Sequence, residues 1–191
     1  MKINYLYIPT FKDIYGFKPK KKVFLDKFSK KLCGKFRKGH FEGVLNVVNR
    51  FIEIIKPRYI ILGKKDYQQI YLIKKHIEIR NIRSKIIECN TIREKNGIAC
   101  SSRNFSLNKD QMKIASNIFY YLSDIKKKIK NNYSLFNVNK IKKDLIYLGA
   151  SKIDYLENYN IKSFKKIKKP NKKFNLFFAY YIKNTRLIDN I

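Results

Sequence analysis

The stretch "YIILGKKDYQQIYLIKKHIEIRNIRSKIIEC" (Tyr59–Cys89) decides the fold class of this chain. Its first five residues are β-rich and are bounded by Pro57 and Gly63, which is typical of a strand. Apolar residues then recur at helical spacing, and a second short apolar run closes the stretch. A strand, a helix and a strand with short links predict a parallel βαβ unit, hence an α/β domain. The recurring residues are Ile70, Ile73 and Ile77, and the second run is Lys85–Cys89.

Apolar periodicity upstream of this stretch predicts one more strand and one more helix. The run "YLYIP" (Tyr5–Pro9) is typical of a strand. Apolar residues then recur at helical spacing from Phe41 to Ile55, and Pro57 ends the predicted helix. Strands and helices therefore alternate along the first half of the chain.

The second half of the chain changes character near Arg103. Asn108 and Gln111 have the spacing of a capping box at the start of a long amphipathic helix. Gly149 closes a second predicted helix, and two strand-like runs follow it. This half is expected to form a small α+β domain. Its predicted elements are Asn108–Ile129, Val138–Ala150, Ser151–Tyr159 and Phe174–Ile182.

The charge of the chain is its most unusual compositional feature. Lys and Arg number 44 against 14 Asp and Glu, which gives a formal net charge of +30 and would attract any polyanion. The lysines are spread throughout and mixed with Asn and Ile, all favoured by AT-rich codons, and no Arg-rich arm or aromatic RNA-binding signature accompanies them. Genome composition is the preferred explanation. A non-catalytic, basic α/β protein that binds RNA stays open as the alternative.

Other classes are excluded by simple counts. No stretch of about 18 uninterrupted apolar residues exists, so we expect no membrane span. Two histidines and no close cysteine pair give no familiar zinc-ligand spacing, and no metal ligands are predicted. The three cysteines are far apart, which suits a reduced, cytoplasmic location.

Three local features are candidates for ligand binding, and each has a plain structural alternative. Gly63, Lys64 and Lys65 follow a parallel strand at the sheet edge where ligands bind in open α/β folds. Asp66 and Gln69 could hold a ligand, or could simply cap the following helix, since they have capping-box spacing.

The second feature is "ACSSRN" (Ala99–Asn104), in which two hydroxyls and the Arg103 guanidinium could cradle phosphate oxygens. The alternative is an ordinary polar turn between domains. The third is "RKGHFEGV" (Arg37–Val44), in which His40 precedes a helix and could orient an anion. The alternative is a capping or packed histidine.

Taken together and in order, the motifs resemble those of the pantothenate synthetase family, the ATP-dependent ligases that join pantoate to β-alanine. The resemblance is collinear from about Ile3 to the C-terminus. It implies an incomplete Rossmann-like nucleotide-binding domain over residues 1–104 and a small α+β lid domain over residues 105–191. The motifs are "RKGHFEGVLNVVNRF", "ILGKKDYQQIYLIKK", "IREKNGIACSSRN" and "TRLIDN".

The resemblance also implies roles for individual residues. Lys65 would face the ATP phosphates, Gly63 and Asp66 would lie near the ribose, and Lys64 belongs to the same ATP motif. Gln69 matches the glutamine that hydrogen-bonds pantoate.

The resemblance implies further ATP contacts in the residues that follow the second predicted strand. Ile92 and Cys100 fall at adenine-contacting positions. Ser101, Ser102 and Arg103 match a phosphate-binding loop at the lid hinge. Arg37 and His40 are possible supporting residues of the same site.

The chemistry that the resemblance implies has two steps. The pantoate carboxylate attacks the α-phosphate of ATP, which releases pyrophosphate and leaves a pantoyl adenylate. The β-alanine amine then attacks this anhydride, giving pantothenate and AMP. Charge neutralisation by Lys65 and Arg103, Mg²⁺ and substrate orientation would supply most of the rate. The family also implies a homodimer.

The chain departs from the family pattern at several positions. Lys38 replaces a usual proline, Lys64 a usual acid or amide, and Cys100 a usual aliphatic residue or methionine. The family's histidine, pantoate and acidic Mg²⁺ motifs would precede Met1. We therefore expect either a complementary N-terminal fragment, a misassigned start or a degraded gene, and little activity from this chain alone.

Overall fold

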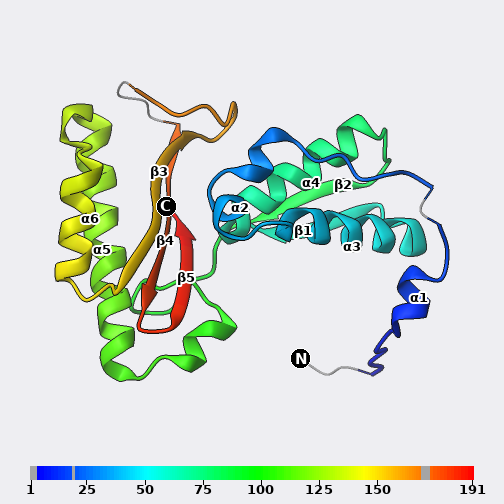
Figure 1. The fold of residues 1–191 in the computed structure, drawn as a ribbon, viewed down its shortest axis with the longest axis horizontal. Helices are drawn as coiled ribbons and strands as arrows, with labels where there is room; N and C mark the ends of the chain where they lie inside the picture. The colour runs from blue at the N-terminus through cyan, green and yellow to red at the C-terminus, as the bar shows by residue number, and fades with distance from the viewer. Residues whose placement is uncertain (1–3, 19, 169–172) are drawn as a thin grey trace. The chain divides into compact units, whose positions relative to one another are not determined.

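The structure is a computed structural model that describes residues 4–18, 20–168 and 173–191 (Figure 1). The chain divides into two compact units, which are treated separately below. The first comprises Met1–Leu62 and Gln68–Glu88, and the second comprises Gly63–Tyr67 and Cys89–Ile191. The predicted division into a Rossmann-like domain over residues 1–104 and a lid over residues 105–191 differs from these two units, and it stays a prediction.

The predicted strand–helix–strand stretch is confirmed. Strand β1 (Tyr59–Gly63) is followed by a 3₁₀ turn, η2 (Lys64–Asp66), helix α4 (Tyr67–Ile79) and strand β2 (Lys85–Cys89). The two strands are neighbours in one parallel two-stranded sheet. The α/β class follows directly from this unit.

Helix α3 (His40–Ile55) confirms the helix predicted upstream of Pro57. It begins after Gly39, whose φ of +75° lies in the left-handed region that favours glycine. Phe41, Leu45 and Ile52 are buried along one face of the helix, as the apolar spacing predicts. Three shorter helical elements precede it and were not predicted. They are α1 (Phe11–Tyr15), η1 (Lys27–Lys30) and α2 (Cys33–Phe36).

The predicted strand at Tyr5–Pro9 is wrong. Residues 5–10 form no regular structure, and the side chains of Tyr5, Leu6, Tyr7 and Ile8 are 74–94% exposed. A strand exists only where its N–H and C=O groups pair with a neighbour. Within the described part of the chain, β1 and β2 are the strands of that sheet and neither pairs with this segment.

One face of the β1–β2 sheet is apolar and exposed. Burial alternates residue by residue along both strands, as expected of a half-buried sheet. On the exposed face lie Tyr59, Ile61 and Ile87, and Ile61 is 67% accessible. An apolar face of this kind is a recognised site of contact with further protein.

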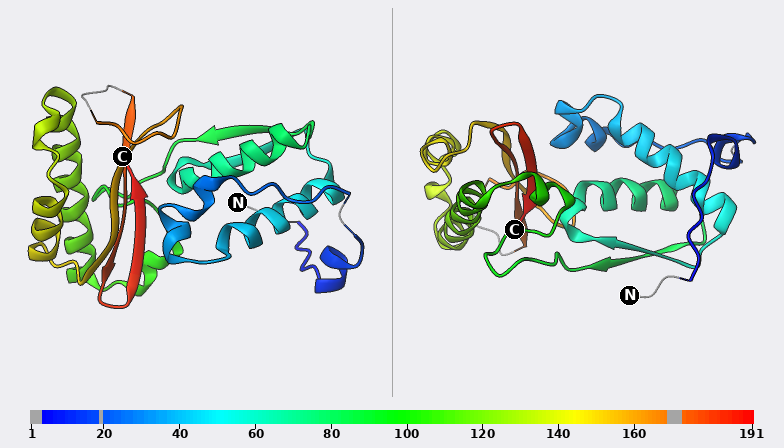
Figure 2. Two further views of the ribbon diagram at one scale, coloured as in Figure 1. Left: turned by 45° about the horizontal axis from the view of Figure 1, so that its top comes forward. Right: turned by 90° about the horizontal axis from the view of Figure 1, so that it is seen from below.

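In the second unit, two helices cover one face of a three-stranded antiparallel sheet (Figures 1 and 2). The strand order is β3-β4-β5. The strands are β3 (Lys152–Asn160), β4 (Phe174–Ile182) and β5 (Thr185–Asn190), and the helices are α5 (Lys109–Asn131) and α6 (Val138–Tyr147). The core lies between the two layers and includes Ile118, Leu122, Leu145 and Phe178.

Local signals predicted this unit well. Asn108 accepts a hydrogen bond from the Gln111 N–H at 2.9 Å, and the Gln111 side chain accepts one from the Asn108 N–H at 2.9 Å, so the capping box is confirmed. Gly149 has φ +108°, as expected of a residue that closes a helix. Strand β5 was quoted only as a motif and was not predicted as a strand. Besides η2, two further 3₁₀ turns belong to the unit, η3 (Ser102–Ser106) and η4 (Tyr133–Leu135).

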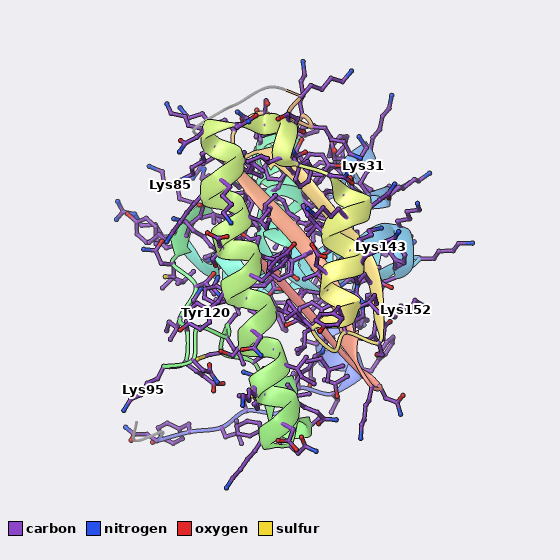
Figure 3. All side chains as sticks on the ribbon, turned by 90° about the vertical axis from the view of Figure 1, so that its left-hand side faces the viewer. Lys31, Lys85, Lys95, Tyr120, Lys143 and Lys152 are labelled. Carbon is purple, nitrogen blue, oxygen red and sulfur yellow. The ribbon has the colours of Figure 1, made fainter. Side chains whose placement is uncertain are left out.

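Most lysines project from the surface, as Figure 3 shows for Lys95, Lys143 and Lys152. The basic runs at 18–22 and 165–173 include residue 19 and residues 169–172, which lie outside the described residues. Within the described part of the chain, no helix is long and apolar enough to cross a membrane.

Candidate nucleotide site

The second unit contains a short hairpin that carries much of the candidate site. Arg93 and Ala99 lie opposite each other in an antiparallel bridge, and the Glu94 N–H donates to the Ile98 carbonyl at 2.9 Å. The turn passes through Gly97, whose φ is +84°. A Cβ at Gly97 would lie 2.4 Å from the Phe119 ring, so this glycine is required by the fold.

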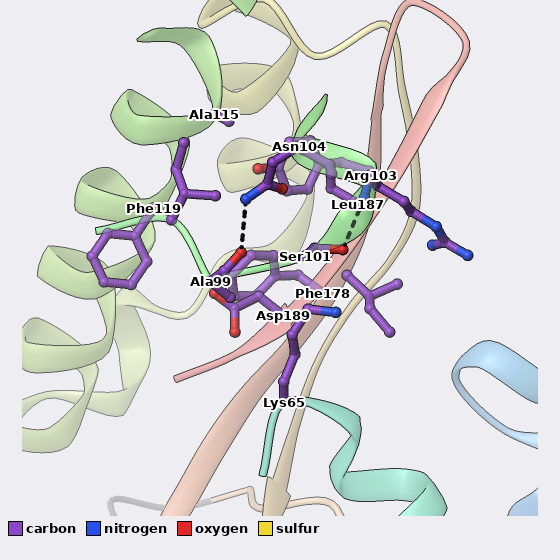
Figure 4. A pocket seen from close by; sticks show the side chains of 13 residues that line it. Lys65, Ala99, Ser101, Arg103, Asn104, Ala115, Phe119, Phe178, Leu187 and Asp189 are labelled. Carbon is purple, nitrogen blue, oxygen red and sulfur yellow. Dashed lines mark hydrogen bonds between the residues drawn. The ribbon is translucent and has the colours of Figure 1, made fainter. Parts of the chain in front are cut away.

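Three of the predicted phosphate-binding residues gather at one small cavity next to this hairpin (Figure 4). Lys65, Ser101 and Arg103 line it together with Asp189, over an apolar floor that includes Phe119 and Phe178. The cavity has a volume of about 20 Å³, enough for a single water molecule. A nucleotide could therefore bind only across its polar side, where the two cations are.

The acid in this cavity is already neutralised. The Arg93 guanidinium donates to both carboxylate oxygens of Asp189, at 2.6 and 3.1 Å. Burial raises the pKa of the Asp189 carboxyl above its usual range, and the Arg93 guanidinium, the Asn190 N–H and the Lys65 charge oppose that shift. Because Arg93 makes the direct two-point contact with Asp189, this carboxylate does not cancel the positive charge that Lys65 and Arg103 add to the cavity. The polar side of the cavity is therefore suited to an anion.

Arg93 itself is held from three directions. Its guanidinium carbon lies 4.5 Å from the centre of the Phe119 ring, a cation–π contact. It also donates to the Gly97 carbonyl at 3.0 Å and to the Asn190 carbonyl at 3.3 Å. Arg93 thus ties the hairpin, helix α5 and strand β5 into one rigid support.

Ser101 and Arg103 are placed by the start of η3. The Ser101 hydroxyl accepts from the Arg103 N–H at 3.3 Å and so caps this turn. The exposed Arg103 guanidinium donates to the Arg186 carbonyl at 3.0 Å, and Ser102 is exposed beside it. Asn104 donates to Glu94 at 2.6 Å and to the Ala99 carbonyl at 3.1 Å, which fixes the turn against the hairpin. The turn therefore presents a hydroxyl and a guanidinium on a fixed base.

The residues predicted to contact adenine lie opposite each other on the two arms of the hairpin. The Cys100 N–H donates to the Ile92 carbonyl at 2.9 Å. Both side chains are exposed, and Ile92 is 77% accessible. An exposed isoleucine and a thiol are apolar enough to contact a base. Their role stays a prediction.

Gly63 differs from Gly97, which the fold requires. Its φ of −80° is ordinary for any residue, and a Cβ added there would meet no atom within 4 Å. The fold alone therefore gives no reason for glycine at this position, whereas a ligand that approaches the backbone closely would.

The capping role of Asp66 stays a prediction. Asp66 is the last residue of the 3₁₀ turn η2, which runs directly into α4 at Tyr67. The residue before the turn is Gly63, which has no side chain to cap with. Asp66 is exposed, and Lys64 donates to the Asn90 side chain at 3.0 Å. The implied ligand roles of both residues stay predictions.

The remaining predicted residues belong to the first unit. Gln69 is half-buried, whereas its neighbour Gln68 is buried and structural: it accepts from the Cys33 N–H at 3.1 Å and donates to the Phe28 and Lys31 carbonyls. Arg37, on the turn before α3, contacts His40, the first residue of α3, at 2.8 Å. The implied roles of Gln69, Arg37 and His40 stay predictions.

Comparisons with known proteins identify the family of this chain. The family model described as pantoate-beta-alanine ligase matches residues 1–191. The chain belongs to the pantoate–β-alanine ligase family. It is 37% identical over 193 residues to pantothenate synthetase of Caldicellulosiruptor saccharolyticus, covering 99% of this chain and 68% of that protein. It is 34% identical to pantothenate synthetase of Thermodesulfovibrio yellowstonii, with the same coverage.

Solved structures of the family share the fold. The pantoate-beta-alanine ligase of Francisella tularensis, complexed with beta-gamma ATP and beta-alanine, has a TM-score of 0.71 and 34% identity over 94% of this chain and 61% of that chain. Pantothenate synthetase of Thermus thermophilus has a TM-score of 0.83 at 23% identity, over 96% of this chain and 67% of that one. The predicted family and the α/β class with a Rossmann-like part and a lid are confirmed. The chain spans about two thirds of the length of these relatives.

Sequence reasoning missed the support of the site. Arg93, Asn104, Asp189 and Asn190 all lie inside the quoted motifs, but none was given a role. The polar residues of "TRLIDN" (Thr185–Asn190) were the available signal that this run has a role, although they do not indicate their partners. This signal was not used because that run was not predicted to be a strand.

Proposed function

We propose that this chain supplies the ATP-binding and lid portion of a pantoate–β-alanine ligase. The observation that carries the proposal is the gathering of Lys65, Ser101 and Arg103 at one cavity whose acid, Asp189, is neutralised by Arg93. The comparisons support this ligase function and do not favour the RNA-binding alternative. ATP as a substrate is further supported by the Francisella tularensis ligase, whose structure is a complex with beta-gamma ATP and beta-alanine.

In the proposed reaction, the two cations act on the phosphates of ATP. As the pantoate carboxylate forms its bond to the α-phosphorus and the bond to the pyrophosphate oxygen breaks, negative charge builds up on the leaving group. Lys65 and Arg103 would stabilise this charge, and Ser101 and Ser102 would donate hydroxyl hydrogen bonds to phosphate oxygens. Attack of the β-alanine amine on the acyl carbon then releases AMP. Gln69 would orient pantoate, and Gly63 would allow the nucleotide to approach the backbone.

Mg²⁺ belongs to the proposal only as a companion of ATP. Among the described residues, no group of three or more His, Cys, Asp or Glu side chains could hold a metal ion. Mg²⁺ is usually bound through one or two carboxylates together with substrate phosphates, so in this proposal it enters with ATP. A cytoplasmic location and a homodimer are further parts of the proposal, suggested by the spaced free cysteines and by the family resemblance respectively.

The test of the nucleotide site is calorimetric titration of ATP in moderate salt. Lys65→Ala and Arg103→Ala are each expected to weaken binding about tenfold, since each removes a charged contact to phosphate. Lys95→Ala is the matched control, because Lys95 is exposed on the hairpin away from the cavity lining. Equal losses in all three variants would mean that ATP responds only to the overall charge of +30.

The test of the reaction is AMP formation that requires both pantoate and β-alanine. We propose that turnover requires a complementary segment carrying the histidine and pantoate motifs of the family. It should therefore be near background for this chain alone and rise when that segment is added. Robust turnover by the chain alone would remove this part of the proposal but would support the ligase function.

A further inference from the structure

Asn190 is the last residue of β5 and is buried, yet its side chain makes three hydrogen bonds. Its Nδ2 donates to the backbone carbonyls of Lys64 and Lys65, at 2.8 and 2.9 Å. Its Oδ1 accepts from the Asn175 Nδ2 at 2.8 Å. Both hydrogens of the amide are thus committed to the turn that carries Lys65.

The position of Asn190 is itself fixed by the sheet. Leu176 and Ile191 exchange two backbone hydrogen bonds, at 2.9 and 3.1 Å, directly beside it. Asn175, on β4, accepts from the Lys126 Nζ on α5 at 3.3 Å. A continuous chain of hydrogen bonds therefore runs from α5 through two asparagines to the Lys64–Lys65 turn.

The other contact described above for the Lys64–Lys65 turn is the hydrogen bond from the Lys64 Nζ to the Asn90 side chain at 3.0 Å, which holds a long side chain rather than the backbone of the turn. It is a single 3₁₀ turn entered through Gly63, the last residue of β1, where a Cβ would meet no atom within 4 Å. Short 3₁₀ turns have poorer hydrogen-bond geometry than α-helix, and glycine before them adds freedom. The position of the Lys65 ammonium at the cavity therefore depends on contacts from outside the turn.

We propose that Asn190 is a positioning residue that holds the Lys64–Lys65 turn so that Lys65 faces the phosphate site. This inference rests on the proposed function of Lys65. In this inference Asn190 does not contact the substrate. It acts through its hydrogen bonds to the backbone carbonyls of Lys64 and Lys65. Asn175 supports this role, because its hydrogen bond to Asn190 fixes the Asn190 amide in the orientation that donates to the turn.

The deciding variant is Asn190→Asp, which keeps the shape of the side chain but places a carboxylate oxygen against two carbonyl oxygens. The matched control is Asn158→Asp, since Asn158 is also buried in the second unit but donates to the Tyr133 hydroxyl at 2.7 Å, away from the turn. Amide hydrogen exchange of residues 63–67 is measured first. We expect exchange at these residues to rise about tenfold or more in Asn190→Asp and to stay unchanged in Asn158→Asp.

Nucleotide titration supplies the second readout. Asn190→Asp should weaken ATP binding about tenfold and leave adenosine binding within twofold, because only the phosphates would meet Lys65. General loss of structure would weaken both ligands, and would do so in Asn158→Asp as well. If Asn190→Asp fails to fold, Asn175→Ala is used in its place. We expect it to raise the exchange of residues 63–67 and to weaken ATP binding, each by less than Asn190→Asp would.

Unchanged exchange of residues 63–67 in Asn190→Asp and in Asn175→Ala would overturn the positioning role. Faster exchange in Asn190→Asp, together with a wild-type chain that binds no ATP, would leave the positioning role in place and remove the proposed function of Lys65. The two failures are therefore separable.

Discussion

Arg93 and Asp189 lie 96 positions apart in the sequence, and their side chains form a two-point ion pair at 2.6 and 3.1 Å. The pair is largely enclosed: the Asp189 side chain is 9% exposed and that of Arg93 is 23% exposed. Removing one partner from such a pair leaves an uncompensated buried charge. The pair connects the hairpin of the candidate site to the strand that ends the chain.

Arg93→Ala should destabilise the second unit by about 3 kcal/mol at neutral pH, because it leaves Asp189 buried without its guanidinium. Burial already raises the pKa of Asp189 above its usual range, and losing Arg93 would raise this pKa further. An acid with a raised folded-state pKa is more easily accommodated when protonated, so its cost grows as the pH rises above the unfolded value. Thermal unfolding should therefore show a larger deficit at pH 7 than at pH 4.5.

The control for this prediction is the double variant Arg93→Ala with Asp189→Asn. The double variant removes the Asp189 charge that is left unpaired in Arg93→Ala. It should therefore recover part of the lost stability and lose the extra pH dependence. A deficit in Arg93→Ala that is equal at both pH values would contradict the explanation.

Gly63→Ala should separate folding from nucleotide binding. The φ of −80° suits alanine and a Cβ would meet no atom within 4 Å, so the melting temperature should stay unchanged or rise slightly. ATP affinity should fall, by about tenfold if the nucleotide approaches the backbone here. Calorimetry and thermal unfolding on the same preparation measure both.

Two other glycines give the matched comparison. Gly43 lies in α3 with no atom near its Cβ position, so Gly43→Ala should stabilise by about 1 kcal/mol and leave ATP binding unchanged. Gly97→Ala should destabilise by about 2 kcal/mol, because its φ is +84° and Phe119 fills the space. Equal ATP affinity in Gly63→Ala and wild type would argue against a close approach at Gly63.

His76 should make the first unit acid-sensitive. It is fully buried: its Nδ1 accepts from the Phe24 N–H at 3.0 Å and its Nε2 donates to Asn49 at 2.9 Å, so the ring is neutral. Burial, and secondarily Arg80, lowers the pKa of His76 below its usual value of 6.5. The unfolded chain then binds the extra proton, and the stability contributed by neutral His76 is lost as the pH falls below 6.5.

The measurement is the melting temperature of wild type and of His76→Gln between pH 7 and pH 5. Wild type should lose more stability than the variant across this window, even if the variant is less stable at pH 7. Since both proteins share all their carboxylates, the difference between them reports the histidine. Parallel curves would show that His76 does not titrate as inferred.

How much of this structure was predictable depended on the range of the interactions involved. The capping box of Asn108 and Gln111 and the end of α3 before Pro57 depend on neighbours in sequence, and both were predicted correctly. Tyr5–Pro9 has strand composition, but a strand also needs a partner, which composition does not report.

The residues that support the candidate site could not be predicted for the opposite reason: their strand has a pairing partner but lacks a clear strand pattern. β5 carries Arg186 and Asp189 within six residues, which masks its strand pattern, and it is stabilised by pairing with β4. The partners of Asp189 and Asn190 are 96 and about 125 positions away, so no local pattern indicates them. Motif order predicted that Lys65, Ser101 and Arg103 gather, whereas the contacts that hold them came only from the three-dimensional structure.

Lys126 should limit stability at neutral pH. It lies on the side of α5 that packs on β4, where it contacts the Phe174 ring and Asn175. Burial, and secondarily the charge of Lys130, lowers the pKa of Lys126 from 10.5 to about 8. Below pH 8 the amine is charged in both states, and the folded protein bears the cost of burying that charge. Between pH 8 and 10.5 the unfolded chain binds more protons, so stability contributed at this site rises with pH.

Lys126→Met removes the charge and keeps the length of the side chain. At pH 7 it should stabilise the protein by about 1 kcal/mol, a figure reduced for the partial solvent exposure of the side chain and for the lost hydrogen bond to Asn175. The advantage over wild type should shrink as the pH rises from 8 to 10, because wild-type Lys126 then loses its proton. Lys127→Met, at the exposed neighbouring position, should shift the melting temperature little at any of these pH values. Thermal unfolding of the three proteins across this range is the measurement, and an advantage of Lys126→Met that stays constant with pH would contradict the assignment.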